Sequence, residues 1–383
     1  MSGAVLEAVP PAATRVAGAK IAILLPDLRG GGVERMRLHL ADEFLAAGHA
    51  VSFWLLKAEG PLLGMVPEGA EVVDLEAPRL RSAAGPVARQ WRAERPDAVL
   101  AAMWPLTDVA ALAKAMAGAA GRRSRLVVSE HNTLSLTPQA KGLLKRAAMR
   151  ATIAAGHRAA DAVVGVSEGV CDDVAALGGM DRRRLHTIYN PAAAGRNDGR
   201  PMSDPWPAPP GGRVLSVGTL KDQKDVPTLL RAMARVRGDA MLCVLGEGSE
   251  RPRLEALVRE LKLEGRVLLP GFAADPAPWY AHADAFALAS RYEGFGNVLV
   301  EALEFGLPVA ATDCRSGPSE ILAGGAYGRL VPVGDDAALA AAIDQTLTDP
   351  ADPDRLKARA AEFTPRRVAT RYLDLLLPKG RPE

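Results

Sequence analysis

The chain has 383 residues, of which 48% are hydrophobic and 24% are charged, and its formal net charge is +2. This length predicts two or three domains, each able to bury a core of its own. The small net charge gives no reason to expect nucleic-acid binding, and no apolar run reaches the roughly 18 residues of a membrane span.

The first 18 residues are rich in alanine, proline and glycine, and they lack the continuous apolar core of a secretory signal. We expect residues 1–18 to form a flexible tail. The three cysteines have no metal-ligand spacing, which is typical of proteins in a reducing compartment. They are Cys171, Cys243 and Cys314. A cytoplasmic location follows from these features.

A strand is predicted from Lys20, and a helix is predicted over residues 33–47. Between them lie three consecutive glycines, of which Gly31 and Gly32 immediately precede the helix. Glycines there allow a ligand to approach the backbone, so a loop facing phosphate or sugar is favoured over a plain flexible turn. The G-x-G-x-x-G dinucleotide fingerprint is absent from this loop, which argues against a dehydrogenase.

Strands and helices then alternate, which predicts a doubly wound parallel sheet. Strands are expected at 51–56, 71–75, 98–102, 125–129 and 162–166, with helices near 86–94 and at 107–119. Ligands bind at the carboxyl ends of such strands, and His131 falls at one of these ends. A lone histidine there is either a structural residue or a ligand contact, and the sequence leaves both interpretations open.

Residues 139–160 predict an alanine-rich helix with two adjacent basic stripes, formed by i,i+4 pairs. The pairs are Lys141 with Lys145 and Arg146 with Arg150. One interpretation is a solvated helix face. The other is docking on an anionic membrane surface, to which each cation contributes about 1 kcal/mol.

A first domain over residues 19–194 is expected to end before a linker at 195–212, which is dense in glycine, proline and aspartate. A second domain is expected over 213–360, beginning with a strand at 213–217. Lys224 lies in the loop that follows, before a helix that starts near Pro227.

The most informative stretch runs from Ser290 to Gly306 between two apolar strands, and predicts a glycine-containing turn followed by a helix from Asn297. The backbone N–H groups of Asn297, Val298 and Leu299 should be free at the positive end of this helix, where a phosphate can bind. Glu293 and Glu301 would repel phosphate. They are either ordinary surface glutamates or contacts to the hydroxyl-rich parts of a ligand, such as a sugar and a ribose.

This stretch resembles the retaining, nucleotide-sugar-dependent glycosyltransferases of the GT-B fold, in the large family with a Glu-x(7)-Glu motif (family 4-like, glycosyl transferases group 1). The motif here is Glu293 to Glu301, and the resemblance covers roughly residues 19–375. It implies an α/β fold with two Rossmann-like, doubly wound domains facing a cleft. It also implies that the last segment, 361–383, returns to the first domain as a helix.

The resemblance implies roles for individual residues. Glu293, Lys224 and His131 would act at the transferred sugar and the leaving diphosphate, with His131 forming hydrogen bonds and not attacking as a nucleophile. The donor would be bound by a further set: Gly31, Gly32, Thr219, Lys224, Gly296, Asn297, Val298 and Glu301. Two positions depart from the family pattern. Thr219 stands where arginine is common, with Lys221 as a possible substitute, and Gly296 stands where proline is common, which should loosen the turn.

The expected function is transfer of a hexose or N-acetylhexosamine from a UDP-sugar to a glycan or lipid-linked acceptor. Many members of the family use lipid-linked acceptors, which favours the membrane interpretation of the basic helix. No cofactor or metal is expected, because the only D-x-D string, Asp352 to Asp354, lies in a proline-rich loop. The alternatives are a nucleotide-sugar epimerase or phosphorylase of the same fold, and a catalytically silent binding subunit. The phosphorylase would need a pyridoxal-bearing lysine segment, which the sequence lacks.

Overall fold

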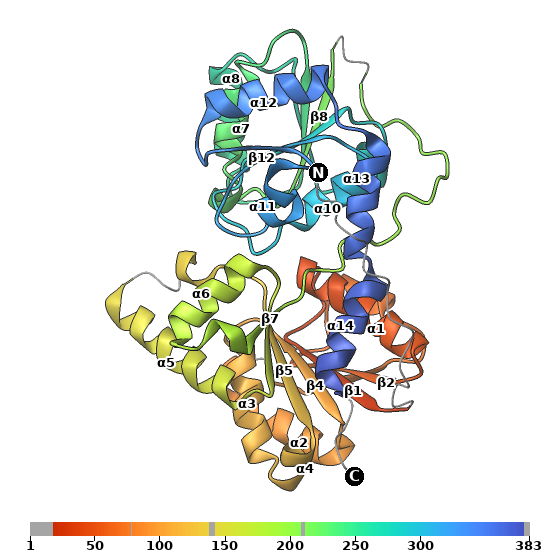
Figure 1. Cartoon of the computed structure of the whole chain (residues 1–383), viewed down its shortest axis with the longest axis vertical. Coiled ribbons are helices and arrows are strands. Elements are labelled where there is room, and N and C mark those ends of the chain that lie inside the picture. The colour runs from red at the N-terminus through yellow and green to blue at the C-terminus, as the bar shows by residue number, and fades with distance from the viewer. Residues whose placement is uncertain (1–17, 78, 138–141, 208–210, 379–383) are drawn as a thin grey trace, which may run out of the picture.

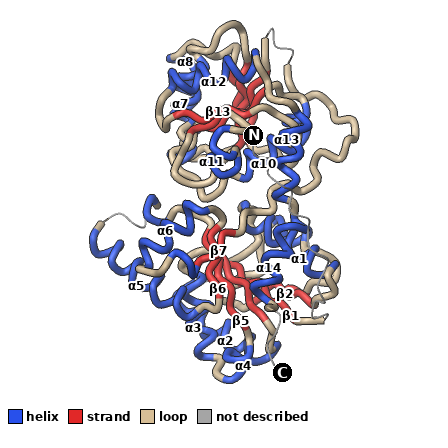
Figure 2. Tube along the Cα trace, in the orientation of Figure 1, coloured by secondary structure: helices blue, strands red, loops and turns tan. Residues whose placement is uncertain are grey.

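The computed structural model describes residues 18–77, 79–137, 142–207 and 211–378. Two parallel sheets form two lobes, one above the other, and each sheet has helices on both of its faces (Figures 1 and 2). The predicted fold class, a pair of doubly wound α/β domains that face each other, is confirmed.

The first domain contains a seven-stranded sheet with the order β3-β2-β1-β4-β5-β6-β7, and all of its pairings are parallel. Central strands read as continuous apolar runs because helices cover both faces of the sheet. The strands are β1 Lys20–Leu25, β2 Ala50–Leu55, β3 Glu71–Asp74, β4 Ala98–Ala102, β5 Arg125–Glu130, β6 Ala162–Gly165 and β7 Leu185–Thr187. The helices are α1 Gly32–Ala46, α2 Ala84–Glu94, α3 Leu106–Met116, α4 Ala119–Arg123, α5 Leu143–Ala159 and α6 Glu168–Gly178.

The second domain repeats this plan with a six-stranded parallel sheet of order β10-β9-β8-β11-β12-β13. In both sheets the strand order reverses beside the first strand, which places the ligand crevice at the carboxyl end of that strand. The strands are β8 Arg213–Val217, β9 Met241–Leu245, β10 Val267–Gly271, β11 Ala285–Leu288, β12 Val309–Thr312 and β13 Arg329–Val331. The helices are α7 Val226–Met233, α8 Arg251–Glu260, α9 Ala277–Ala281, α10 Asn297–Glu304, α11 Pro318–Ile321, α12 Asp336–Thr348 and α13 Pro353–Ala360.

Some predicted helices differ from the observed ones. The helix expected at 107–119 is two helices, α3 and α4, because Gly118 interrupts it with a φ of +62°. The helix expected over 361–383 is observed as α14 (Pro365–Leu376), which residues 361–364 separate from α13, and residues 379–383 lie outside the described residues. Proline fits the first turn of a helix but not its interior, so Pro365 begins α14 instead of continuing α13.

Helix α14 crosses from the second lobe to the first and lies against α1 (Figure 1). Its apolar face joins the core beneath the first sheet, where Tyr372 and Leu376 are fully buried with Leu40 and Phe44 of α1. The end of the chain therefore packs on the domain that begins it.

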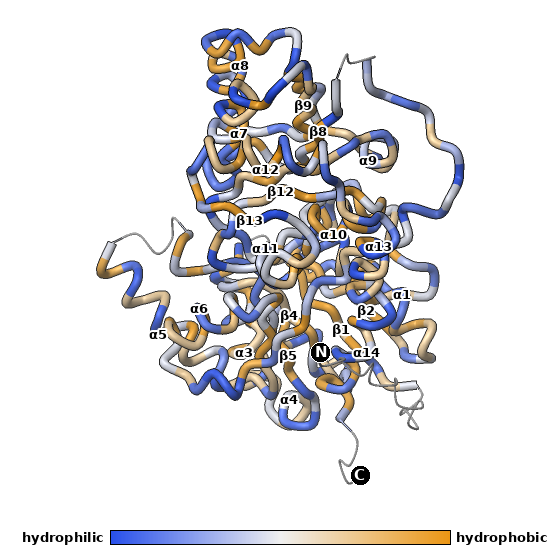
Figure 3. Tube along the Cα trace, turned by 45° about the horizontal axis from the view of Figure 1, so that its top comes forward, coloured by the Kyte–Doolittle hydropathy of each residue, from blue (hydrophilic) through white to orange (hydrophobic). Residues whose placement is uncertain are grey.

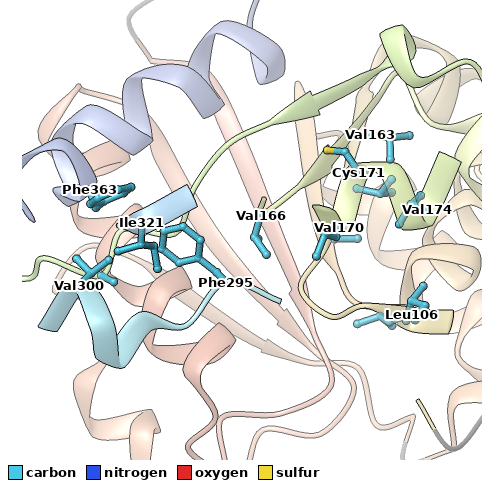
Figure 4. Packing of buried hydrophobic residues seen from close by; sticks show 14 of the residues in the cluster. Leu106, Val163, Val166, Val170, Cys171, Val174, Phe295, Val300, Ile321 and Phe363 are labelled. Carbon is cyan, nitrogen blue, oxygen red and sulfur yellow. The ribbon is translucent and has the colours of Figure 1, made fainter. Parts of the chain in front are cut away.

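A seam of buried side chains joins the two domains beside the crevice. Three aromatic rings form its centre, with Tyr189 stacked on Phe295 at 5.4 Å between ring centroids and Phe363 edge-on to both. Polar contacts reinforce it, because the Glu320 carboxylate accepts hydrogen bonds from the first two N–H groups of α6. Figure 4 shows the apolar part of the seam, with Phe295, Val300, Ile321 and Phe363 at one end and Val166 and Val170 beyond them.

Candidate functional site

The turn after β11 holds the Glu293 carboxylate in a buried position. The residue is only 6% exposed, and its Oε1 accepts two short hydrogen bonds. The donors are Ser290 Oγ and Lys224 Nζ, each 2.6 Å away. Burying a carboxylate is costly unless it is paired and hydrogen-bonded, and this site meets both conditions.

The loop that carries Lys224 is tied to the Glu293 turn by three contacts. Arg291 N–H donates to the Gln223 carbonyl at 2.8 Å, and Gln223 Nε2 donates to the Tyr292 carbonyl at 2.8 Å. The Arg291 guanidinium also pairs with Asp225 at 3.2 Å. Lys224 and Glu293 are therefore presented as a pair. The sequence assigns them to different parts of a donor and does not predict this contact.

The N-terminus of α10 offers two free donors. Within the described residues, the N–H groups of Asn297 and Val298 have no hydrogen-bond partner, whereas Leu299 N–H donates to the Gly296 carbonyl at 2.9 Å. The expectation that Leu299 is also free is wrong, because the first turn of the helix tightens onto Gly296. Gly296 has a φ of +100°, a conformation that proline cannot adopt. The glycine is therefore required by the shape of this turn.

Loops of the first domain meet the same turn from across the crevice. The backbone contact is close at Gly294, where an added Cβ would lie 1.9 Å from the His131 carbonyl oxygen. Thr133 Oγ1 donates to the Glu293 carbonyl at 2.8 Å, and Asn190 Nδ2 donates to Asn297 Oδ1 at 2.8 Å. Any residue larger than glycine at position 294 would separate the two domains here.

A cavity of about 450 Å³ opens between the domains at this point. Every residue that the sequence assigns to catalysis or donor binding lines it, although the residues come from loops spread over most of the chain. They are Gly31, Gly32, His131, Thr219, Lys224, Glu293, Gly296, Asn297, Val298 and Glu301. The cavity is thus a mixed surface of glycine backbone, two free helical N–H groups, lysine and carboxylate.

A second cavity of about 380 Å³ adjoins the first, and both are lined by Thr219, Val298 and Glu301. Its far wall is Phe272, which follows β10 and is 69% exposed, an unusual state for so large an apolar side chain. The two cavities are therefore neighbours, with Glu293 lining the first and Phe272 lining the second.

Glu301 lies where the two cavities join. Its Oε2 accepts a hydrogen bond from Tyr280 OH at 3.0 Å and pairs with Arg196 Nη1 at 3.0 Å. Burial, together with the nearby Glu301 carboxylate, raises the pKa of Tyr280 well above its usual value, so the phenol remains a donor. Arg196 was missed by sequence reasoning because it lies in the segment expected to be a linker. That segment is anchored by Glu304, which accepts hydrogen bonds from Gly195 N and Arg196 N.

His131 is buried beside an arginine. It is 7% exposed, and its Nε2 lies 2.9 Å from Ser129 Oγ and 3.4 Å from Arg37 Nη2. Burial, reinforced by the charge of Arg37, lowers the pKa of His131 well below its usual value. The imidazole can therefore form hydrogen bonds in the cavity, but it does not carry a positive charge near neutral pH.

The basic helix, α5, lies away from the cavity and projects from the first domain (Figure 1). Lys145, Arg146 and Arg150 are exposed, and Lys141 lies outside the described residues. Two leucines at the start of the helix, Leu143 and Leu144, are 90% and 88% exposed. Apolar and basic residues therefore share this tip, which Figure 3 shows as mixed orange and blue.

The Asp352-Pro353-Asp354 string is a helix cap. Asp352 Oδ1 accepts a hydrogen bond from Asp354 N at 3.0 Å, at the N-terminus of α13. Within the residues that the structure describes, no cluster of three histidine, cysteine, aspartate or glutamate side chains is arranged to hold a metal ion. In the cavity, the groups that can donate hydrogen bonds to a diphosphate include Lys224 and the backbone N–H groups of Asn297 and Val298.

Comparison with known proteins gives two family matches, "Glycosyltransferase Family 4" over residues 30–194 and "Glycosyl transferases group 1" over residues 209–363. The chain is 32% identical, over 266 residues, to N-acetylgalactosamine-N,N'-diacetylbacillosaminyl-diphospho-undecaprenol 4-alpha-N-acetylgalactosaminyltransferase of Campylobacter jejuni. That alignment covers 68% of this chain and 72% of the relative.

Two solved structures share the fold at low sequence identity. The lipopolysaccharide outer core galactosyltransferase WaaB in its apo form matches with a TM-score of 0.71 and 20% identity, over 94% of this chain and 100% of that one. Anabaena HepE in complex with UDP-glucose matches with a TM-score of 0.68 and 22% identity, over 93% and 96% of the two chains.

Proposed function

Because this chain belongs to the glycosyltransferase family described as glycosyl transferases group 1 and glycosyltransferase family 4, we propose that it transfers a hexose or N-acetylhexosamine from a UDP-sugar to an acceptor hydroxyl. The chain is a glycosyltransferase of the hexosyltransferase class. The acceptor in our proposal is a glycan or lipid-linked glycan of the cell envelope. The name of the Campylobacter jejuni relative gives a sugar linked to diphospho-undecaprenol as the acceptor of that protein. The reaction proceeds with retention.

The donor in this proposal spans the two cavities. The uracil lies against Phe272, and the ribose hydroxyls bind Glu301, where the cavities join. The diphosphate lies between Lys224 and the N-terminus of α10, and the sugar lies beside Glu293 and His131. Residues 213–360 thus form the donor domain and 19–194 the acceptor domain, with 195–212 between them. UDP-glucose in the fold relative from Anabaena supports the choice of uridine.

Lys221 supplies a second positive charge for the diphosphate, in place of the arginine that is common at position 219. It lines the same cavity as Lys224, and among the described residues it forms no salt bridge, although the Glu293 carboxylate is close enough to attract it. Burial and the neighbouring Lys224 lower the pKa of Lys221, because both disfavour its charged form. A bound diphosphate would compensate for both effects.

The observation that carries the proposal is the convergence of all ten sequence-predicted residues on one cavity. Glu293 is the carboxylate nearest the sugar position, and Lys224 and Ser290 both occupy its Oε1. In our proposal Glu293 binds the sugar through its other oxygen, and the acceptor approaches on the face from which the diphosphate departs. Lys224 and the helix dipole stabilise the departing charge without a metal ion.

A screen of nucleotide sugars with soluble and lipid-linked acceptors tests this proposal, with product masses as the readout. We expect the acceptor to gain the mass of one sugar when a UDP-sugar is supplied. An isomerised donor of unchanged mass would identify an epimerase. Donor binding without any change of mass would identify a silent binding subunit, and either result would refute the proposal.

Truncating Phe272 should weaken UDP binding. Stacking of a base on an aromatic ring contributes about 1–3 kcal/mol, so Phe272→Ala should raise the dissociation constant of UDP by roughly 5- to 150-fold. Isothermal calorimetry checks this, and uridine and UDP should weaken by the same factor because the ring contacts only the base. Unchanged UDP affinity would place the base elsewhere.

The tip of α5 is proposed to dock on an anionic membrane surface, on the cytoplasmic side where lipid-linked acceptors present their sugars. Lys145, Arg146 and Arg150 supply the charge, while Leu143 and Leu144 supply exposed apolar side chains that can enter the interface. Among the described residues, none of the helices is both long and apolar enough to cross a bilayer. Contact with the membrane through this helix would therefore be peripheral.

Reversing charge at the α5 tip should reduce membrane binding. Each cation contributes about 1 kcal/mol, so Lys145→Glu with Arg146→Glu should weaken binding to phosphatidylserine vesicles by at least about 30-fold at low salt. Sedimentation with vesicles measures this. Arg259→Glu with Lys262→Glu changes net charge equally at an exposed site on the second domain and should have little effect. Equal loss of vesicle binding in both variants would show that the basic side of α5 is an ordinary solvent-exposed helix face.

A further inference from the structure

A fully buried arginine lies beneath the proposed sugar site. Arg37 is on α1 and is 0% exposed, and no carboxylate pairs with it in the described part of the chain. Its guanidinium carbon lies 5.2 Å from the centre of the Tyr372 ring, and burial disfavours its charged form, whereas the Tyr372 side chain favours it. Within the part of the chain that the structure describes, no group lies at hydrogen-bonding geometry to its Nε and Nη1. An unpaired buried charge is costly, so a structural role alone explains this arginine poorly.

The remaining nitrogen of Arg37 begins a chain of hydrogen bonds that ends at His131. Arg37 Nη2 donates to Ser129 Oγ, which lies 2.9 Å from His131 Nε2. A guanidinium can only donate, so the Ser129 oxygen accepts from it and directs its own proton to another acceptor. The other acceptor within reach, the Ala101 carbonyl, is farther away at 3.4 Å. His131 Nε2 is therefore the acceptor.

Among the residues that the structure describes, no carboxylate forms a hydrogen bond with the His131 ring. Glu130, the adjacent acid, directs its oxygens to His157 Nε2 at 3.0 Å, Thr107 Oγ1 at 3.0 Å and Trp104 N at 2.9 Å. Arg37 Nη2 itself lies 3.4 Å from His131 Nε2, where a proton on Nε2 would face another N–H group. The ring is left with its proton on Nδ1, which is buried at the cavity wall and has no partner among the described residues.

We propose that Arg37 is a positioning residue that, through Ser129, holds His131 in the neutral Nδ1–H tautomer, so that the ring donates a hydrogen bond to the sugar bound in the cavity. The tautomer follows from the protein alone, whereas the identity of the acceptor group rests on the proposed function. A histidine in the other tautomer would offer a lone pair at Nδ1, where it could only accept a hydrogen bond from a sugar hydroxyl and could not donate one.

Nuclear magnetic resonance of the full chain labelled with 15N-histidine tests the tautomer without any donor. Long-range proton–nitrogen spectra distinguish Nδ1–H from Nε2–H, and His131→Gln identifies the signal among the six histidines. We expect Nδ1–H in the wild type, a shift towards Nε2–H in Arg37→Met, and Nδ1–H again in Arg37→Lys, which keeps an obligate donor. Should Arg37→Met fail to fold, Arg37→Gln also removes the group that can only donate, while keeping a polar side chain, and should likewise raise the share of the Nε2–H tautomer.

Kinetics provide a second readout. Arg37→Met should lower kcat about tenfold with little change in KM for the donor, and Arg37→Lys should restore most of the loss. The hydrogen bond lost from His131 is made to the sugar that reacts, so its loss should affect the reaction step more than donor binding. An Nε2–H tautomer in the wild type, or an unchanged tautomer in a folded Arg37→Met, would overturn the inference. The NMR result stands even if the donor screen finds no sugar transfer, so the two failures can be told apart.

Discussion

Replacing Lys224 by methionine should lower kcat/KM for the nucleotide sugar by 10- to 100-fold, as steady-state kinetics will measure. A charge-assisted contact contributes about 1.5–3 kcal/mol, and each 1.4 kcal/mol corresponds to about a tenfold change in rate. The same substitution should destabilise the fold by about 3 kcal/mol, because the Glu293 carboxylate would remain buried without its cation. Denaturant unfolding will measure this second effect.

The double variant Lys224→Met with Glu293→Gln separates these two effects. It leaves no unpaired charge, and Ser290 can still donate to the amide oxygen, so most of the lost stability should return. Activity should not return, because neither the diphosphate cation nor the sugar-binding carboxylate is present. Recovery of wild-type kcat/KM in the double variant would show that Lys224 serves only to neutralise Glu293.

Removing the Glu301 carboxylate should raise the dissociation constants of UDP and of the whole donor by 10- to 100-fold. Glu301 is proposed to accept hydrogen bonds from the ribose, and such bonds to a charged group contribute about 1.5–3 kcal/mol. Calorimetry with Glu301→Ala measures the loss. Because the base does not contact Glu301 in our proposal, free uracil should bind equally weakly to the variant and the wild type.

Tyr280→Phe is the matched control for Glu301. It removes the hydroxyl that donates to Oε2 at 3.0 Å but leaves the carboxylate and its Arg196 partner in the cavity. We expect a change of less than about threefold in UDP affinity, because Glu301 keeps its Arg196 partner and one neutral hydrogen bond contributes only about 1 kcal/mol or less. A larger loss in Tyr280→Phe than in Glu301→Ala would show that Glu301 is a structural partner of Tyr280 and not a ribose contact.

Local sequence patterns predicted which residues would meet in one crevice, because each pattern has a direct geometric meaning. A strand, a glycine-containing turn and a helix place the turn at the carboxyl end of a sheet, so Gly31, His131 and Glu293 could be expected in one crevice. The Rossmann-like fold follows from the same alternation of strands and helices. The family resemblance then joined the two halves and supplied the role of Lys224.

Local patterns do not predict contacts between segments that are far apart in the sequence. Arg196 is in a glycine- and proline-rich stretch that resembles a linker, yet it reaches Glu301, more than a hundred residues later in the chain. The buried Arg37 looks in the sequence like one more charged residue of an amphipathic helix. Its environment depends on α14, from the far end of the chain, which no local pattern predicts. Leu299 was misassigned because the tightening of a first helical turn is a property of the backbone and not of residue type.

A structure of this chain bound to a UDP-sugar tests most directly the claim that one elongated site holds the whole donor. We predict that the diphosphate oxygens accept hydrogen bonds from Asn297 N and Val298 N and lie against Lys224 Nζ, with uracil on Phe272 and ribose on Glu301. A diphosphate bound away from the N-terminus of α10, or bound to the protein chiefly through a divalent ion, would contradict this account.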